Sequence, residues 1–152
     1  MTLREKLNAA VKDAMRAREQ RKVSTLRLIL AAVKDRDIVR RTESDERDDD
    51  LIISEIMARM IKQRHDSIKA YEEGGRLELA EKEREEIDII SAFLPRQLGD
   101  EEIETACQTV VDELEATALK DIGRCMALLK ERHAGQMDFA KASQTVKAIL
   151  SA

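Results

Sequence analysis

Aromatic side chains are almost missing from this chain of 152 residues, which has two phenylalanines, one tyrosine and no tryptophan. Proteins that bind single-stranded nucleic acid by stacking need aromatic rings beneath the bases, so the composition argues against such a platform. Glycine (5 residues) and proline (1 residue) are also scarce. So few turn-forming residues leave little room for a many-stranded β fold.

Long apolar runs are lacking as well. No run approaches the ~18 apolar residues of a membrane-spanning helix, so we expect no membrane partner. Residues 1–22 carry a charge every two or three positions and contain no apolar segment of a secretory signal. From this we expect a cytoplasmic protein.

Only two cysteines occur, Cys107 and Cys125, and both lie within amphipathic patterns. Buried thiols in a reducing compartment are the favoured interpretation, and a disulfide or a shared metal is the alternative. A zinc or redox site would need more closely spaced cysteines or histidine partners.

Helix-forming residues are abundant, and apolar side chains recur with the helical period almost throughout. Thr2 and Glu5 have the spacing of a capping box before the first helix. A short break near Arg18–Gln20 precedes a second helix, and the polar stretch 42–50 follows it. We predict two longer helices next, at about 48–73 and 76–93.

The segment from Pro95 to Gly99 is the best domain boundary, because the only proline disfavours helix at the residue before it. Beyond it the pattern predicts three shorter helices, which begin at Gly99 or Asp100, at about Asp121 and at Asp138. We therefore predict an all-α fold with a helical N-terminal domain of long helices (residues 1–95) and a C-terminal three-helix tail subdomain (residues 96–152).

Charge is distributed unevenly along the chain. Residues 1–41 hold 12 Lys and Arg against 5 Asp and Glu, whereas the whole chain has a net charge of −4. The basic stretch around Arg18, Arg21 and Lys22 could contact phosphates. The alternative is a solvated helix pair that faces the acidic middle of the chain. We expect any nucleic-acid binding to be local and salt-sensitive, and we expect no DNA binding.

No motif for catalysis stands out. The chain lacks a P-loop, a glycine-rich dinucleotide turn, a zinc-protease helix and a nucleophile elbow. Its two histidines, His65 and His133, lie far apart in sequence. We predict no catalytic residue, no metal ligand and no cofactor.

Three segments resemble a known family. They are S-T-L-R-L-I-L-A-A-V-K (24–34), I-K-Q-R-H-D-S-I-K-A-Y-E-E-G-G-R (61–76) and F-L-P-R-Q-L (93–98), and the tail adds D-I-G-R-C-M (121–126). Their order and spacing are similar to those of bacterial-type YqeY-like proteins of the GatB/YqeY domain family. The resemblance implies an all-α protein whose tail is related to that of the B subunit of tRNA-dependent amidotransferases, where it helps to grip tRNA.

The resemblance also implies site residues. Gly123 and Met126 match the family's G-x-x-M segment, and Gly135 and Asp138 match its G-x-x-D turn. The family often has a lysine after this second glycine, where the present chain has Gln136. Either helix packing or a close nucleic-acid backbone would explain a glycine at 123. The predicted RNA-binding residues are Lys120, Gly123, Arg124, Lys130, Gly135 and Lys141 in the tail, with Arg18, Arg21 and Lys22 near the N-terminus.

Two hypotheses of function stay open at this point, and a family label adds a third. The first is a non-catalytic module that binds tRNA by its shape. The second is an adaptor that docks an amidotransferase or a tRNA synthetase without touching RNA. The third is a carbon–nitrogen ligase with glutamine as amido donor, for which the sequence shows no nucleophile or nucleotide site.

Overall fold

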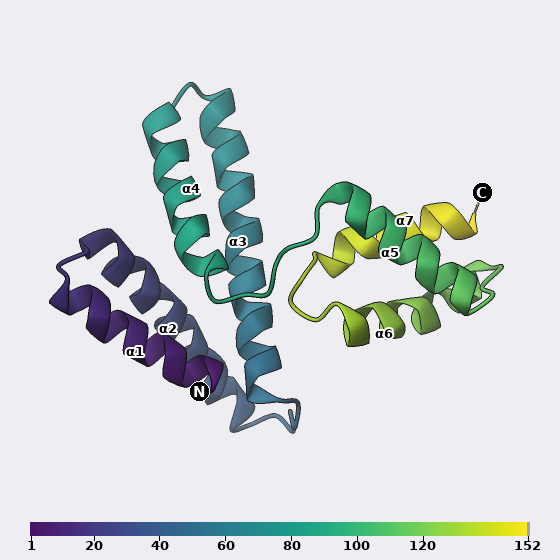
Figure 1. Cartoon of the computed structure of the whole chain (residues 1–152), viewed down its shortest axis with the longest axis horizontal. Helices are drawn as coiled ribbons and strands as arrows, with labels where there is room; N and C mark the ends of the chain where they lie inside the picture. The colour runs from purple at the N-terminus through teal and green to yellow at the C-terminus, as the bar shows by residue number, and fades with distance from the viewer. Residues whose placement is uncertain (152) are drawn as a thin grey trace. The chain divides into compact units, whose positions relative to one another are not determined.

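The computed structural model describes residues 1–151, which form seven α-helices, one short 3-10 helix (η1) and no β-strand (Figure 1). The predicted all-α class is confirmed. The elements are α1 (Leu3–Arg16), α2 (Gln20–Arg40), α3 (Asp49–Glu73), α4 (Leu77–Ser91), α5 (Asp100–Glu113), η1 (Leu119–Asp121), α6 (Ile122–Arg132) and α7 (Phe139–Leu150). The chain divides after Pro95 into two compact units.

Unit 1, which ends at Pro95, consists of two helical hairpins (Figure 1). Helix α1 packs against α2, helix α3 packs against α4, and α2 also contacts both members of the second hairpin. Each helix contributes apolar residues at three- and four-residue spacings, which place them on one face. The buried core is formed by Leu3, Leu7, Ala14, Leu26, Ile29, Val33, Ile53, Met57, Met60 and Ile90.

Three helices end in the same backbone motif, in which one residue takes a left-handed conformation. After α1 this residue is Arg18, with φ 57°, and the N–H of the next residue donates to the carbonyl of Ala14 at 3.0 Å. The corresponding residues are Gly75 after α3 (φ 72°) and Glu115 after α5 (φ 51°). The predicted break near Arg18–Gln20 is therefore confirmed, although no glycine marks it.

The outer half of the second hairpin, residues 61–89, is here called the α3–α4 arm. Figure 1 shows the tips of α3 and α4 running beyond the first hairpin. Ala80 is the one fully buried residue in the arm. Ion pairs also link the two helices of the arm: Arg64 donates to Glu86 at 2.8 Å, and Arg84 pairs with Glu72.

Unit 2 begins at Arg96 and is built from α5, η1, α6 and α7. The three α-helices pack against one another. Its core contains Ile103, Cys107, Val110, Val111, Cys125, Met126, Leu129, Met137, Ala142, Val146 and Leu150. Both cysteines are free and buried, so the prediction of buried thiols is confirmed. Within residues 1–151, no helix combines the length and the apolar character needed to cross a bilayer.

Candidate nucleic-acid interface

Gly123 lies in the first turn of α6 and is exposed. A Cβ atom added to it would meet no atom within 4 Å, and its φ is not left-handed. Neither packing nor backbone geometry therefore requires a glycine here, although glycine costs a helix about 1 kcal/mol relative to alanine. The packing explanation for Gly123 is wrong, and the residue leaves bare backbone at the surface.

Two exposed residues continue this surface along α6. Ala127 and Lys130 follow Gly123 by four and seven positions, so the three share one face of the helix. Lys120 precedes them in η1 and is also exposed. We call Lys120, Gly123, Ala127 and Lys130 the α6 strip: two small residues between two lysines. Over the described chain, neither lysine side chain has a hydrogen bond or an ion pair.

Two of the other predicted tail residues make ion pairs within unit 2. Arg124 donates to Asp121 at 2.8 Å, and Lys141 pairs with Asp100. The Arg124 guanidinium, together with the backbone N–H groups of Thr117 and Ala118, holds the pKa of Asp121 below its usual value. Arg124 directly follows Gly123 in sequence and Lys141 lies on α7, and the charge of both cations is partly compensated.

Gly135 is buried and supports a turn rather than offering a surface. Its φ of 73° is left-handed, which suits glycine. Its carbonyl accepts a hydrogen bond from Nε2 of Gln97 at 2.7 Å. The N–H of Leu98 donates to the carbonyl of Gln136 at 2.9 Å. Gln97 and Leu98 of the F-L-P-R-Q-L segment therefore hydrogen-bond the start of unit 2 to the turn between α6 and α7.

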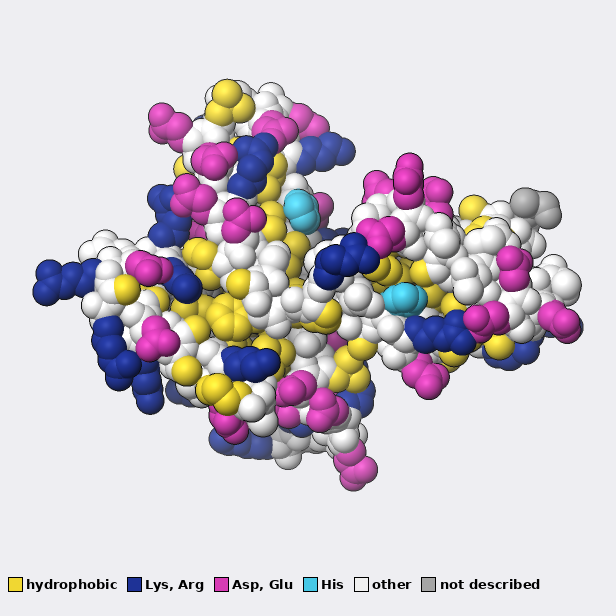
Figure 2. Space-filling model, viewed as in Figure 1, with side chains coloured by type: hydrophobic (Ala, Val, Ile, Leu, Met, Phe, Trp, Pro, Cys, Tyr) yellow, Lys and Arg dark blue, Asp and Glu magenta, His cyan; other side chains and the backbone are white. Residues whose placement is uncertain are grey.

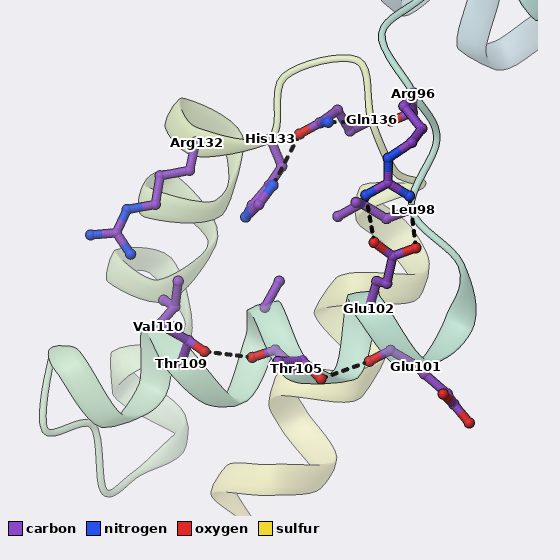
Figure 3. A pocket seen from close by; sticks show the side chains of 11 residues that line it. Arg96, Leu98, Glu101, Glu102, Thr105, Thr109, Val110, Arg132, His133 and Gln136 are labelled. Carbon is purple, nitrogen blue, oxygen red and sulfur yellow. Dashed lines mark hydrogen bonds and ion pairs between the residues drawn. The ribbon is translucent and has the colours of Figure 1, made fainter.

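A pocket of about 610 Å³ opens beside this turn, between α5 and the end of α6 (Figure 3). Figure 3 shows Arg96 and Glu102 facing each other across its rim, with the imidazole of His133 pointing into it. The Arg96 guanidinium donates to both carboxylate oxygens of Glu102, at 2.9 and 2.6 Å. This pair, helped by the N–H of Gly99, lowers the pKa of Glu102 to about 2.

Most polar groups of this pocket are already engaged. Arg132 pairs with Glu113 at 2.5 Å, and the hydroxyls of Thr105 and Thr109 donate to backbone carbonyls one turn earlier. His133 contacts the amide oxygen of Gln136 at 3.0 Å through Nδ1. The pocket thus lacks a free nucleophile next to a base, the pair that covalent catalysis needs. No cluster of metal-ligating side chains is found in residues 1–151.

The basic residues near the N-terminus differ in whether a carboxylate compensates their charge. Arg21 pairs with Glu85 of α4, and the Lys22 ammonium lies 3.9 Å from Glu19. Arg18 makes no such contact with the described residues. Figure 2 shows Lys and Arg side chains gathered at the end of the α1–α2 hairpin where the two helices are joined.

A second pocket, of about 450 Å³, lies at this α1–α2 junction. Its lining comprises Met15, Arg18, Gln20, Val23, Ser24 and Arg27. Sequence reasoning selected Arg18 as a site residue and counted Arg27 only as part of the basic N-terminal stretch. It missed Ala127 in the α6 strip. The spacing from Gly123 to Ala127 was visible in the sequence, whereas the meeting of Arg18 with Arg27 depends on how the α1–α2 turn folds.

Comparison with known proteins now identifies the family. A family model described as "Yqey-like protein" matches residues 4–150, which is nearly the whole chain. The chain belongs to the YqeY-like family. The resemblance found in the segments at 24–34, 61–76 and 93–98 is thereby confirmed.

Curated relatives of this YqeY-like chain come from yeasts. "Altered inheritance of mitochondria protein 41, mitochondrial" of Eremothecium gossypii is 29% identical over 113 residues, which cover 73% of this chain and 60% of the relative. The protein of the same name from Vanderwaltozyma polyspora is 30% identical over 110 residues, covering 71% of this chain and 58% of the relative. The chain therefore spans about 60% of the length of these relatives.

The names of these relatives contradict the expected cytoplasmic localisation, because they are given as mitochondrial proteins. That expectation was wrong for a physical reason. The lack of an apolar segment near residue 1 bears on secretion, whereas mitochondrial targeting peptides are amphipathic and arginine-rich and need no apolar run. The absence of an apolar run therefore does not separate cytoplasmic from mitochondrial proteins.

Proposed function

We propose that this YqeY-like chain is a non-catalytic module that binds folded tRNA by its shape, with the α6 strip as a principal contact. The exposed backbone at Gly123 supports the proposal most directly, because no contact within the described part of unit 2 requires a glycine at this position. The lysines at either end of the strip supply charge for phosphates, and the small residues between them let an RNA backbone approach closely.

The charge of the surrounding unit is consistent with contact through this strip. Helix α5 carries six acidic and no basic residues, whereas the basic residues that follow Arg96 all lie from Lys120 onward. An RNA backbone would be repelled from α5 and attracted toward η1 and α6, which carry the lysines of the strip. Binding through so few cations should be modest and should weaken with salt.

The cysteines and the pocket of unit 2 support the non-catalytic part of the proposal. Burial raises the pKa of the Cys107 and Cys125 thiols, which keeps them protonated and poorly nucleophilic. Within the pocket, Arg96 pairs with Glu102, Arg132 pairs with Glu113, and the two threonine hydroxyls donate to backbone carbonyls. A carbon–nitrogen ligase that uses glutamine would need a nucleophile to release ammonia. Release of ammonia from glutamine by the purified chain would contradict the proposal that the module is non-catalytic.

The test is binding of bulk tRNA to the purified chain at ~50 and ~200 mM salt, a range over which phosphate contacts weaken strongly. Gly123→Ala should weaken binding while raising the free energy of unfolding by about 0.5–1 kcal/mol, because the new Cβ meets open space. Gly123→Arg separates two explanations. If charge attraction alone drives tRNA binding, the added arginine should tighten it. If the RNA backbone approaches Gly123 closely, the arginine side chain should abolish binding.

The lysines are tested by charge reversal. Lys120→Glu and Lys130→Glu should each weaken tRNA binding and reduce its salt dependence. Lys147→Glu on α7 is the matched control, because Lys147 is also an exposed lysine of unit 2 outside the strip. Equal effects of all three substitutions, or no tRNA binding at ~50 mM salt, would contradict the proposal. Circular dichroism of each variant distinguishes loss of binding from loss of helix.

An adaptor for an amidotransferase or a tRNA synthetase is the second candidate function. The α3–α4 arm favours it, because Leu77 at the tip is 66% exposed and Leu79 is also exposed. An arm with little buried core and exposed leucines is suited to contact another protein. The adaptor is favoured if the chain retains such a protein, if Leu77→Asp abolishes this retention, and if the chain does not bind tRNA.

A further inference from the structure

The pocket at the α1–α2 junction contains two arginines for which the described residues provide no carboxylate partner. The neighbouring cations are compensated: Arg16 lies 3.3 Å from Asp13, and Arg21 and Lys22 pair with Glu85 and Glu19. Arg18 and Arg27 line the pocket without any ion pair among the described residues. The pocket therefore concentrates uncompensated positive charge.

Most N–H groups of the Arg27 guanidinium have no acceptor among the described residues. Within residues 1–151 the guanidinium makes one hydrogen bond, from Nη2 to Sδ of Met15 at 3.4 Å. A thioether sulfur is a weak acceptor, and a guanidinium has five N–H donors in a planar fork. An oxyanion offers much stronger acceptors to the same fork. The contact with Met15 thus holds Arg27 near the pocket without neutralising it.

The backbone at Arg18 points to a role for its side chain. Arg18 occupies the left-handed position that ends α1, as Gly75 does after α3 and Glu115 does after α5. A residue with a Cβ atom costs about 1–2 kcal/mol in this conformation, and glycine does not. Backbone strain of this kind is often found at binding sites. Here it places a guanidinium at the wall of a pocket, which a glycine cannot do.

We propose that the α1–α2 pocket, through Arg18 and Arg27, binds the phosphate group of a phosphate monoester. Near neutral pH a monoester carries a charge between −1.5 and −2, with three acceptor oxygens, and this charge matches two guanidinium groups. Ser24 and Gln20 offer further polar groups, while Met15 and Val23 offer apolar surface for the organic part of the ligand. The volume of about 450 Å³ falls within the range of small-molecule sites.

This site goes beyond the proposed function, because it lies in unit 1 and does not involve the α6 strip. A phosphate monoester has two sources, a free metabolite such as a nucleoside monophosphate or the 5′ end of an RNA. The probes are therefore inorganic phosphate, adenosine 5′-monophosphate, adenosine, and one short oligoribonucleotide prepared with a 5′-phosphate and with a 5′-hydroxyl.

Calorimetry on the full chain gives the first result. Adenosine 5′-monophosphate should bind, inorganic phosphate should compete with it, and adenosine should not bind. Arg18→Gly and Arg27→Gln should each weaken binding by about tenfold, the loss expected for one charge-assisted hydrogen bond. Arg18→Gly suits the left-handed position, so its melting temperature should stay the same or rise. Unchanged binding in both variants, or equal binding of adenosine, would overturn the proposal.

Two controls match these variants. Glu115→Gly makes the same left-handed replacement in unit 2, and Arg59→Gln removes an exposed arginine of α3 that lies outside the pocket. Both should bind adenosine 5′-monophosphate as the parent does. A stronger response to the 5′-phosphate than to the 5′-hydroxyl on the oligoribonucleotide identifies an RNA end as the source, and equal responses identify a free monoester. Lys130→Glu should leave binding of the monophosphate intact, which separates this site from the tRNA surface.

Discussion

Arg4 and Asp37 form a bidentate ion pair in which both Nη atoms of the arginine donate to the carboxylate, each at 2.9 Å. The pair ties the start of α1 to the end of α2. Arg4 also donates to Asp49 at the start of α3, at 3.2 and 3.0 Å. The hydrogen bond from Arg4 is the largest cause of the lowered pKa of Asp37 and of Asp49. One arginine thus joins three helices.

Asp37→Asn should lower the free energy of unfolding by about 1 kcal/mol at pH 7, since the pair is partly exposed and screened. The folded pKa of Asp37 lies below its unfolded value, so the stabilisation is complete above that unfolded value and is lost as the pH falls through the folded pKa. Urea unfolding at pH 7 and at low pH measures the difference. Asp13→Asn, in an exposed pair with Arg16, is the control and should change little. A penalty that persists at low pH would contradict the role of the charge.

Arg64 and Glu86 form the most buried ion pair of the α3–α4 arm, with side chains 12% and 13% exposed. Arg64→Ala should destabilise the chain by about 2–4 kcal/mol, because it leaves Glu86 and Glu83 without their cation. The double variant Arg64→Met with Glu86→Leu should recover part of this loss, since it removes the closer ion pair as a unit and leaves only Glu83 without its Arg64 partner. Urea unfolding of the three proteins tests the prediction. A double variant no better than the single one would show that Arg64 acts by packing.

Glu115→Gly should raise the free energy of unfolding by about 0.5–1 kcal/mol. Glycine relieves the left-handed conformation at φ 51°, and its greater freedom in the unfolded chain offsets part of the gain. The reverse change, Gly75→Ala, should destabilise by about 1 kcal/mol although a Cβ there meets nothing within 4 Å. Thermal unfolding measures both, and shifts of the same sign would contradict the argument.

Cys107 and Cys125 should not react with a thiol reagent in the native chain. Both are fully buried, and burial raises the pKa of each thiol. Reaction should appear when the chain unfolds in urea, with two thiols per molecule. Cys107→Ser and Cys125→Ser assign the signals. Rapid labelling of either cysteine in the absence of urea would contradict its burial.

Local sequence signals predicted the helices well, because helical periodicity and caps are properties of neighbouring residues. Thr2 caps α1 by accepting a hydrogen bond from the N–H of Glu5 at 3.1 Å, as the capping-box spacing predicted. The left-handed residues Arg18 and Glu115 carry no such signal, because glycine is the usual residue there.

The candidate sites were only partly predictable, since the face that a helix exposes depends on elements distant in sequence. Gly123 was recognised, but only the packing of α5 and α7 shows that its surface is open. Arg21 was predicted as a phosphate contact, yet its partner Glu85 lies 64 positions away. The uncompensated charge of Arg27 was likewise invisible without the fold.

The α3–α4 arm has a consequence for how the chain unfolds. Only Ala80 is buried in residues 61–89, while Met57, Met60 and Ile90 at the arm's base belong to the core of unit 1. Segments with few buried apolar contacts open at a lower free energy than the core beside them. Backbone amides toward the Gly74–Gly75 turn will therefore exchange with solvent through local fraying, and those near Met57 only through cooperative unfolding. Unit 1 thus carries a gradient of stability along one pair of helices.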